Sequence, residues 1–245
     1  IFISNYSPLF NQKKYIDLCK KYTNTIKKVD KKNFVNFKYK EKAKKIKIGF
    51  VSVDFKEHAV MNFLTETLKM LNVNNFETIA FNLTKPTSQD SKTKQLKDIF
   101  TDWQDIQHLS DIETVNLIRD NKINILFDLA GYTDGSKIEI FKHRSAPLQI
   151  AWLGYSNSTG VDEMDYIITD PYVLESNINY SEKLLQLPNI WSCHMPIKQG
   201  VEIKDLPALK NGYITFGSFN NFAKISDETI EIWSDLLLKV KSKLI

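Results

Sequence analysis

Short apolar runs alternate with amphipathic stretches along the middle of this chain. Five runs have the length of buried strands, at residues 46–51, 77–83, 123–129, 148–153 and 164–169. Between them, apolar side chains recur at helical spacing, which predicts helices at residues 59–71, 111–119 and 136–142. Strands that alternate with helices in this way predict an α/β fold built on a parallel, doubly wound sheet.

The two ends of the chain follow different patterns. Residues 12–26 predict a helix, and a polar, Lys-rich connection follows it. Near the other end, residues 213–219 predict a strand that runs into a polar loop, and Ser226 is a good N-cap for a following helix. We therefore divide the chain into three parts, at residues 1–45, 46–205 and 206–245.

Composition narrows the class of protein. The 245 residues carry a net charge of +4, and the Lys-rich run at 27–47 is more typical of a solvated linker than of a nucleic-acid site. No apolar run is long enough to span a membrane, and no secretory signal is present. Cys19 and Cys193 form no CxxC pair, which fits a reducing compartment. We expect a cytoplasmic protein without nucleic-acid or membrane partners, and the first residue, Ile1, suggests a piece of a longer chain.

Several familiar chemical signatures are missing from the sequence. It contains no GxGxxG, GxxxxGK[ST], HExxH or GxSxG motif, and no Asp-x-Asp pair that would carry a divalent metal. The four histidines are too scattered for a recognisable metal cluster, at positions 58, 108, 143 and 194. We therefore predict neither a bound metal nor a resident cofactor.

Two polar residues follow predicted strands. His58 comes after the first strand of the sheet, at the end where α/β folds place ligands. It is either a polar residue at a helix start or a base with a pKa near neutrality. Asp128 ends a buried strand, and a buried carboxylate needs partners. It is either a structural acceptor for the following turn or a site residue.

The segment from Arg144 to Gly160 gives a strand, a glycine at its carboxyl end and a small polar loop. Gly154 would allow the backbone to approach a ligand closely, and the loop offers hydroxyl groups. Trp152 and Tyr155 are either core residues or a platform for a ligand. The segment is therefore a second candidate site.

A lone lysine, Lys224, precedes the helix expected after Ser226. A cation beside a helix N-terminus, at the carboxyl end of a strand, is where α/β proteins hold phosphates. The same residues also fit an ordinary strand–loop–helix junction with a solvated lysine.

Six stretches together resemble the catalytic region of the O-GlcNAc transferase/SPINDLY family of protein O-glycosyltransferases. They occur in the family's order and cover about residue 46 to the end, whereas residues 1–45 resemble the connector that follows a superhelix of tetratricopeptide repeats in that family. The stretches are IGFVSVDFKEH (48–58), ILFDLAGYT (125–133), RSAPLQIAWLGY (144–155), MDYIITD (164–170), YSEKLLQLP (180–188) and FGSFNNFAKIS (216–226).

The resemblance implies a GT-B fold, in which a nucleotide sugar binds between two Rossmann-like halves. Here residues 46–205 would form the first half, and 206–245 only the start of the second. The family moves a sugar, usually N-acetylglucosamine from UDP-GlcNAc, onto Ser or Thr hydroxyls of proteins, with inversion and without a required metal. The partners implied are a nucleotide sugar, a protein or peptide acceptor, and upstream tetratricopeptide repeats.

The resemblance also implies roles for individual residues. Lys224 matches the lysine that contacts the donor diphosphate, and His58 matches a histidine once favoured as the general base. Asn221 falls in the same nucleotide loop as Lys224, and Thr133 and Gly154 fall in loops that line the cleft. These five residues are the predicted catalytic and nucleotide-sugar-binding site.

Departures from the family leave alternatives open. Asn62 and Asn124 stand where animal-type members have His, and most of the second half is missing, so we expect weak donor binding and little turnover by this chain. One alternative is a SPINDLY-like protein O-fucosyltransferase that uses GDP-fucose. Another is a non-catalytic interaction module derived from the same fold.

Overall fold

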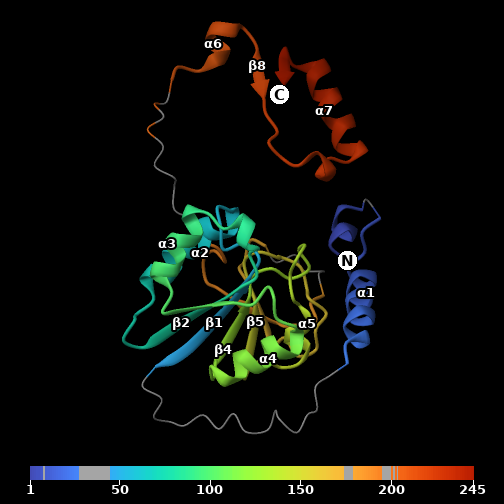
Figure 1. The fold of residues 1–245 in the computed structure, drawn as a ribbon. Helices are drawn as coiled ribbons and strands as arrows, with labels where there is room; N and C mark the ends of the chain where they lie inside the picture. The colour runs from blue at the N-terminus through green and yellow to red at the C-terminus, as the bar shows by residue number, and fades with distance from the viewer. Residues whose placement is uncertain (8, 28–44, 174–178, 195–199, 201, 203) are drawn as a thin grey trace. The chain divides into compact units, whose positions relative to one another are not determined.

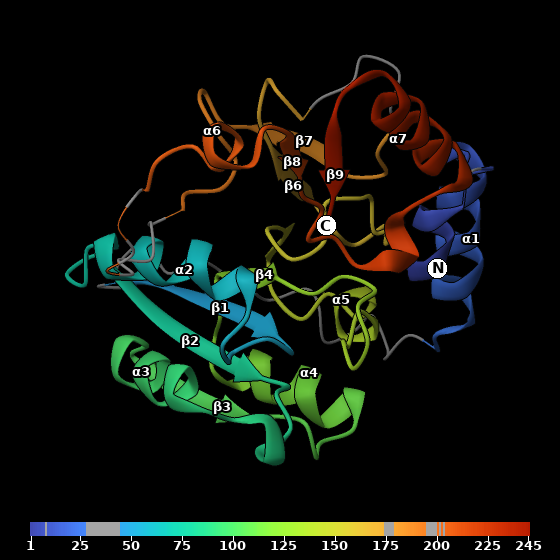
Figure 2. The same ribbon diagram turned by 90° about the horizontal axis from the view of Figure 1, so that it is seen from above.

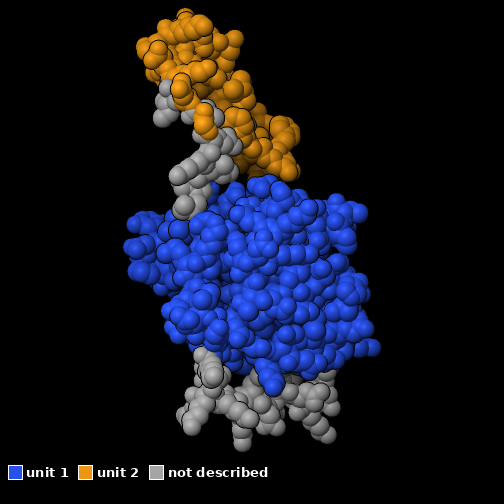
Figure 3. Space-filling model, turned by 60° about the vertical axis from the view of Figure 1, so that its left-hand side comes forward, with its two compact units in different colours: residues 1–2, 11–195 blue, residues 3–10, 196–245 orange. Residues whose placement is uncertain are grey.

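The computed structural model describes residues 1–7, 9–27, 45–173, 179–194, 200, 202 and 204–245. These residues form two compact units, one of residues 1–2 and 11–195 and one of residues 3–10 and 196–245 (Figure 3). Most of the predicted Lys-rich connection, residues 28–44, lies outside the described residues. Each unit is treated separately below.

The first unit contains a parallel sheet of seven strands in the described part of the chain, in the order β3-β2-β1-β4-β5-β6-β7. Its middle strands β2, β1, β4 and β5 are labelled in Figure 1. The register of its central pair aligns Ile48 with Ile125. The strands are β1 (Ile46–Ser52), β2 (Phe76–Asn82), β3 (Asp102–Asp105), β4 (Ile125–Asp128), β5 (Leu148–Ala151), β6 (Tyr166–Thr169) and β7 (Lys183–Gln186). The predicted doubly wound parallel sheet is confirmed.

Helices connect the strands from β1 through β5, and α1 precedes β1. Two of them begin with a capping box, in which the N-cap and the third helical residue exchange hydrogen bonds: Asp90 with Thr93, and Ser110 with Glu113. The helices are α1 (Gln12–Thr25), α2 (Ala59–Met70), α3 (Ser91–Ile99), α4 (Asp111–Asp120) and α5 (Glu139–Lys142), with short 3₁₀ turns η1 (Phe2–Tyr6) and η3 (Pro86–Ser88).

The sheet is buried on both faces, which explains the nearly continuous apolar runs of its central strands. Neighbouring residues of β1 belong to different core clusters, Phe50 on one face and Val51 on the other. Met61 and Leu64 of α2 pack into the Phe50 cluster, whereas Val115 of α4 packs into the Val51 cluster. Helices α2 and α4 therefore cover opposite faces of the sheet (Figure 2).

The strand order places a topological switch point in the middle of the sheet. From β1 the chain first builds outward through β2 and β3, then returns to β4 and builds outward on the other side. Connections on the two sides of such a point diverge, and they leave room for a ligand at the carboxyl ends of the strands. In this unit that place is the carboxyl edge between β1 and β4.

The second unit has a parallel pair of strands and one long helix. Its elements are α6 (Pro207–Asn211), β8 (Ile214–Phe216), the 3₁₀ turn η4 (Phe222–Lys224), α7 (Asp227–Lys239) and β9 (Ser242–Leu244). The predicted N-cap is confirmed, because the Ser226 hydroxyl accepts a hydrogen bond from Thr229 N at 3.3 Å. None of the described residues of this unit is buried.

Candidate functional site

Three of the predicted site residues follow adjacent strands at one edge of the first unit. His58 follows β1, Thr133 follows β4 and Gly154 follows β5. A methyl group placed at Gly154 would lie 3.4 Å from Val60, the second residue of α2. The β5 loop therefore reaches the start of α2, beside His58, across the switch point.

His58 is the N-cap of α2. Its Nδ1 accepts a hydrogen bond from Val60 N at 3.4 Å and lies 3.6 Å from Asp54 Oδ2. The side chain is 42% exposed, and Nε2 has no hydrogen-bond partner among the described residues. The structural interpretation of His58 as a helix-start residue is therefore correct, and the same geometry leaves one ring nitrogen for a ligand.

Asp128 is a structural acceptor for the turn after β4. Its Oδ1 accepts hydrogen bonds from Ala130 N at 2.9 Å and Gly131 N at 3.0 Å. Burial raises the pKa of the carboxyl to about 6, although the two amide donors act in the opposite direction. The Thr133 hydroxyl is also used locally, because it donates to Ala130 O at 2.8 Å. This turn is therefore held by its own side chains.

Gly154 is required by packing. A Cβ at this position would lie 1.8 Å from Leu129 O, so a larger residue would push the β4 and β5 loops apart. The neighbouring Leu153 has a φ of 75°, in the left-handed region that non-glycine residues seldom occupy. Strain of this kind concentrates at functional sites. We call residues 153–160 the site loop.

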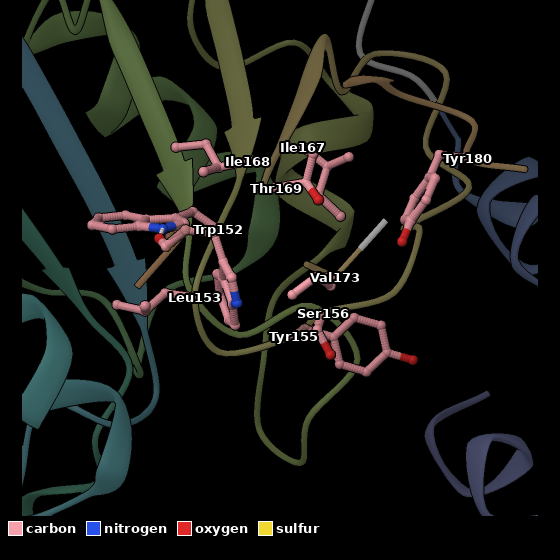
Figure 4. Close-up of a pocket in the computed structure, with 10 residues that line it drawn as sticks. Trp152, Leu153, Tyr155, Ser156, Ile167, Ile168, Thr169, Val173 and Tyr180 are labelled. Atoms are coloured by element: carbon pink, nitrogen blue, oxygen red, sulfur yellow. Dashed lines mark hydrogen bonds between the residues drawn. The ribbon is translucent and has the colours of Figure 1, made fainter. Parts of the chain in front are cut away.

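The site loop forms one wall of a small, mainly apolar pocket at the carboxyl ends of β5 and β6 (Figure 4). Trp152 Nε1 donates to Trp191 O at 2.9 Å and closes one side. The Thr169 hydroxyl oxygen is buried and has no hydrogen-bond partner among the described residues. The lining residues are Trp152, Leu153, Tyr155, Ser156, Ile167, Ile168, Thr169, Val173, Tyr180 and Trp191. Trp152 and Tyr155 are thus both buried and pocket-lining.

Most hydroxyls of the site loop are turned inward. The buried Glu182 carboxylate accepts hydrogen bonds from Ser158 Oγ at 2.8 Å, Thr159 N at 2.7 Å and the Thr159 hydroxyl. These groups therefore fix the loop to the start of β7, and the expectation that the loop offers its hydroxyls to a ligand is wrong for Ser158 and Thr159. Ser156 lines the pocket.

A second buried carboxylate anchors the opposite wall of the pocket. Asp170 accepts hydrogen bonds from the backbone N–H groups of Tyr172, Val173 and Trp191, at 2.7–2.8 Å. Burial opposes ionisation, but these three donors outweigh it and lower the pKa of Asp170. The sequence pattern did not reveal this role, since Trp191 is 21 residues away.

The remaining predicted residues, Asn221 and Lys224, lie in the second unit. The Asn221 side chain accepts from Ala223 N at 3.0 Å and caps the turn η4, which ends at Lys224. Lys224 is exposed and stands two residues before the N-cap of α7. Because His58 belongs to the other unit, its pairing with Lys224 stays a prediction.

The described part of the chain offers neither a metal-binding cluster nor a bilayer-spanning helix. No group of three or more His, Cys, Asp or Glu side chains in that part of the chain is arranged to hold a metal ion. No helix there is both long enough and apolar enough to cross a bilayer.

Comparison with known proteins gives consistent results. The chain is 33% identical over 199 residues to a protein named probable UDP-N-acetylglucosamine–peptide N-acetylglucosaminyltransferase SPINDLY, from Solanum lycopersicum, covering 79% of this chain and 21% of that protein. It is 28% identical over 207 residues to the Arabidopsis thaliana protein with the same description and the name SEC, covering 80% and 21%. The chain thus spans about a fifth of the length of these curated relatives.

The solved structures show a matching fold. A mutant of Thermobaculum terrenum O-GlcNAc transferase superposes with a TM-score of 0.83 at 24% identity, over 98% of this chain and 45% of that one. This likeness confirms the predicted α/β fold of GT-B type. The sequence model of glycosyl transferase family 41 matches residues 8–198 and ends before Asn221 and Lys224. Because that match covers most of the chain, the chain belongs to glycosyl transferase family 41.

Proposed function

We propose that the chain forms the first half, and the start of the second, of a protein O-glycosyltransferase catalytic region. The reaction is the transfer of N-acetylglucosamine from UDP-GlcNAc to Ser or Thr hydroxyls of proteins. Family membership and the names of the similar plant proteins support this assignment. The observation that carries it is the position of His58, Thr133 and Gly154 on adjacent strand ends beside the switch point.

The proposed chemistry is a single displacement. The acceptor oxygen bonds to the anomeric carbon while the bond from that carbon to the diphosphate breaks, so the configuration inverts. The acceptor proton passes to a base, for which we propose Nε2 of His58. That role requires the ring proton on Nδ1, so His58 would give up the cap bond from Val60 N and turn Nδ1–H toward Asp54 Oδ2, 3.6 Å away. A positioned base contributes about 10²- to 10⁴-fold in rate.

Lys224 would act on the leaving group. The departing nucleoside diphosphate gains negative charge as its bond to the sugar breaks, and an ammonium group beside it offsets that charge. Lys224 is suited to this role because it is exposed and lies just before α7, whose N-terminus also favours anions. With a lysine and a helix terminus at the diphosphate, the proposal requires neither a metal ion nor a resident cofactor.

The proposal extends to the context of the chain. Since the chain spans about a fifth of its curated relatives, we propose that it binds nucleotide sugar weakly when isolated. We also propose upstream tetratricopeptide repeats and a cytoplasmic location. Isothermal titration of the chain with UDP-GlcNAc tests the first point, and micromolar affinity would contradict it.

The donor sugar is tested directly by transfer assays. We expect the gene product that contains this chain to transfer label from UDP-GlcNAc to proteins of a cell extract. Transfer only from GDP-fucose would instead favour the SPINDLY-like fucosyltransferase. Failure to transfer from either donor would favour a non-catalytic interaction module.

A further inference from the structure

Helix α1 packs directly on the site loop, and the residues that bond across this contact are more than 130 positions apart in the sequence. Its buried residues Tyr15 and Cys19 form one apolar cluster with Tyr155 of the loop. Near the end of the helix, the Thr23 hydroxyl lies 3.5 Å from Gly160 O, its acceptor in the loop. The helix therefore follows the loop along its length.

The bond that joins the two elements runs through Tyr15. Its hydroxyl donates to Ser158 O at 3.1 Å and lies 2.5 Å from the Tyr155 hydroxyl. A Tyr hydroxyl has one proton, so when Tyr15 gives it to Ser158 O, the Tyr155 hydroxyl donates to Tyr15. Tyr15 thereby ties together the beginning and the middle of the site loop.

The fit between helix and loop is also steric. Gly160 has a φ of 63°, and a Cβ at this position would lie 2.4 Å from Cys19 Cβ. The loop can therefore lie against α1 only because this residue is glycine.

Tyr155 transmits this contact to the pocket. Its ring fills the space over Gly131, where an added Cβ would be 2.4 Å from the Tyr155 ring. The same side chain lines the pocket and adjoins Gly154 and the strained Leu153. Release of the Tyr155 hydroxyl would therefore loosen the wall that carries a predicted site residue.

We infer that Tyr15 is a positioning residue: through its hydrogen bond to Tyr155, helix α1 holds the site loop in the shape that binds the donor sugar. The effect on kinetics rests on the proposed function, whereas the effect on the loop rests only on contacts within the first unit.

The structural part is tested by amide hydrogen exchange on the chain with Tyr15→Phe. We expect the amides of Gly154, Thr159 and Gly160 to exchange about fivefold faster or more, as the loss of a buried hydrogen bond predicts. The exchange rates of amides in the central strands should change only as far as the global stability changes. The matched control is Tyr22→Phe, the same chemical change on the same helix, whose hydroxyl bonds Glu139 in α5. Equal loop exchange in the two variants would overturn the inference.

The kinetic part uses the gene product that contains this chain. Tyr15→Phe should lower kcat/KM about five- to tenfold and raise the donor KM. A loss of folded enzyme would lower the apparent kcat but would leave KM unchanged. Tyr155→Phe added to Tyr15→Phe should cost little more, because both remove the same bond. Wild-type inactivity with both donors would defeat the proposed function and leave the exchange result valid. An active wild type with unchanged KM in Tyr15→Phe would defeat the inference.

Discussion

Replacement of Asp128 by Asn should make the first unit more stable at neutral pH. The Asp128 side chain is 4% exposed. Its Oδ1 accepts hydrogen bonds from Ala130 N and Gly131 N, and Gly131 N also lies 3.1 Å from Oδ2 as a donor. An Asn carbonyl oxygen in the place of Oδ1 can accept both of its bonds, and only the longer contact of Gly131 N with Oδ2 is lost. The substitution therefore keeps the turn and removes a buried negative charge.

The expected gain in stability follows from the pKa of the Asp128 carboxyl. Burial raises the pKa of Asp128 from 3.8 to about 6, and one pKa unit corresponds to about 1.4 kcal/mol. The folded state therefore holds the proton more tightly than the unfolded chain. The stability that comes from the neutral carboxyl is fully present below about pH 4 and is lost as pH rises through about 6. Above that pH, ionisation costs the folded state about 3 kcal/mol, which Asp128→Asn avoids.

Urea unfolding at several pH values between 4 and 8 measures this difference. Tryptophan fluorescence reports on the first unit through Trp103, Trp152 and Trp191. The free energy of unfolding of Asp128→Asn minus that of the wild type should rise by about 2 kcal/mol between pH 4 and 7, since part of the change already falls below pH 4. Taking the difference removes the pH dependence of all other groups, provided that they do not couple to Asp128.

Asp170→Asn is the matched control, because its effect on stability at neutral pH should have the opposite sign. The pKa of Asp170 is lowered, so its charge stabilises the fold at neutral pH and that contribution is lost as pH falls below about 4. Its two oxygens accept three amide bonds, and an Asn amide group would oppose at least one donor. Asp170→Asn should therefore destabilise at pH 7. A pH-independent difference for Asp128→Asn would refute the reasoning about Asp128.

Three further predictions address the candidate site. Gly154→Ala places a methyl group 1.8 Å from a carbonyl oxygen and should lower the free energy of unfolding by about 3 kcal/mol. Gly200→Ala, a position with open space around it, should change that free energy little. Urea unfolding measures both. His58→Asn keeps an N-cap, so stability should hold while transfer by the gene product slows about 10²- to 10⁴-fold; an active variant would exclude the base role. Lys224→Ala should weaken UDP-GlcNAc binding to the gene product at least about tenfold in titration calorimetry, and the exposed Lys241→Ala should not; equal affinities would remove Lys224 from the donor site.

The central sheet could be predicted from the sequence because its strands are buried on both faces. The runs that contain β1, β2, β4, β5 and β6 are apolar for that reason. Strands β3 and β7 were missed, since both lie at sheet edges and have mostly exposed or half-exposed side chains. Helix α3 was missed because it is polar, although Asp90 and Thr93 form a capping box that gave a usable signal.

The candidate site was predictable only in part. Strand ends locate His58 and Gly154, because parallel strands bring their carboxyl ends to one edge. The contacts that shape the site are distant in sequence, as between Tyr15 and Tyr155 or between Glu182 and Thr159. Local periodicity shows that such residues are buried, but it does not identify their partners.

The second unit, unlike the first, has no apolar core among its described residues. Without a buried side chain among its described residues, it gains little free energy by folding alone, and it presents Phe219, Phe222 and Leu238 to water. Taken by itself, this stretch has an exposed apolar surface of the kind that chaperones bind. Proteases should digest it first, and a resistant core close to residues 11–195 should remain.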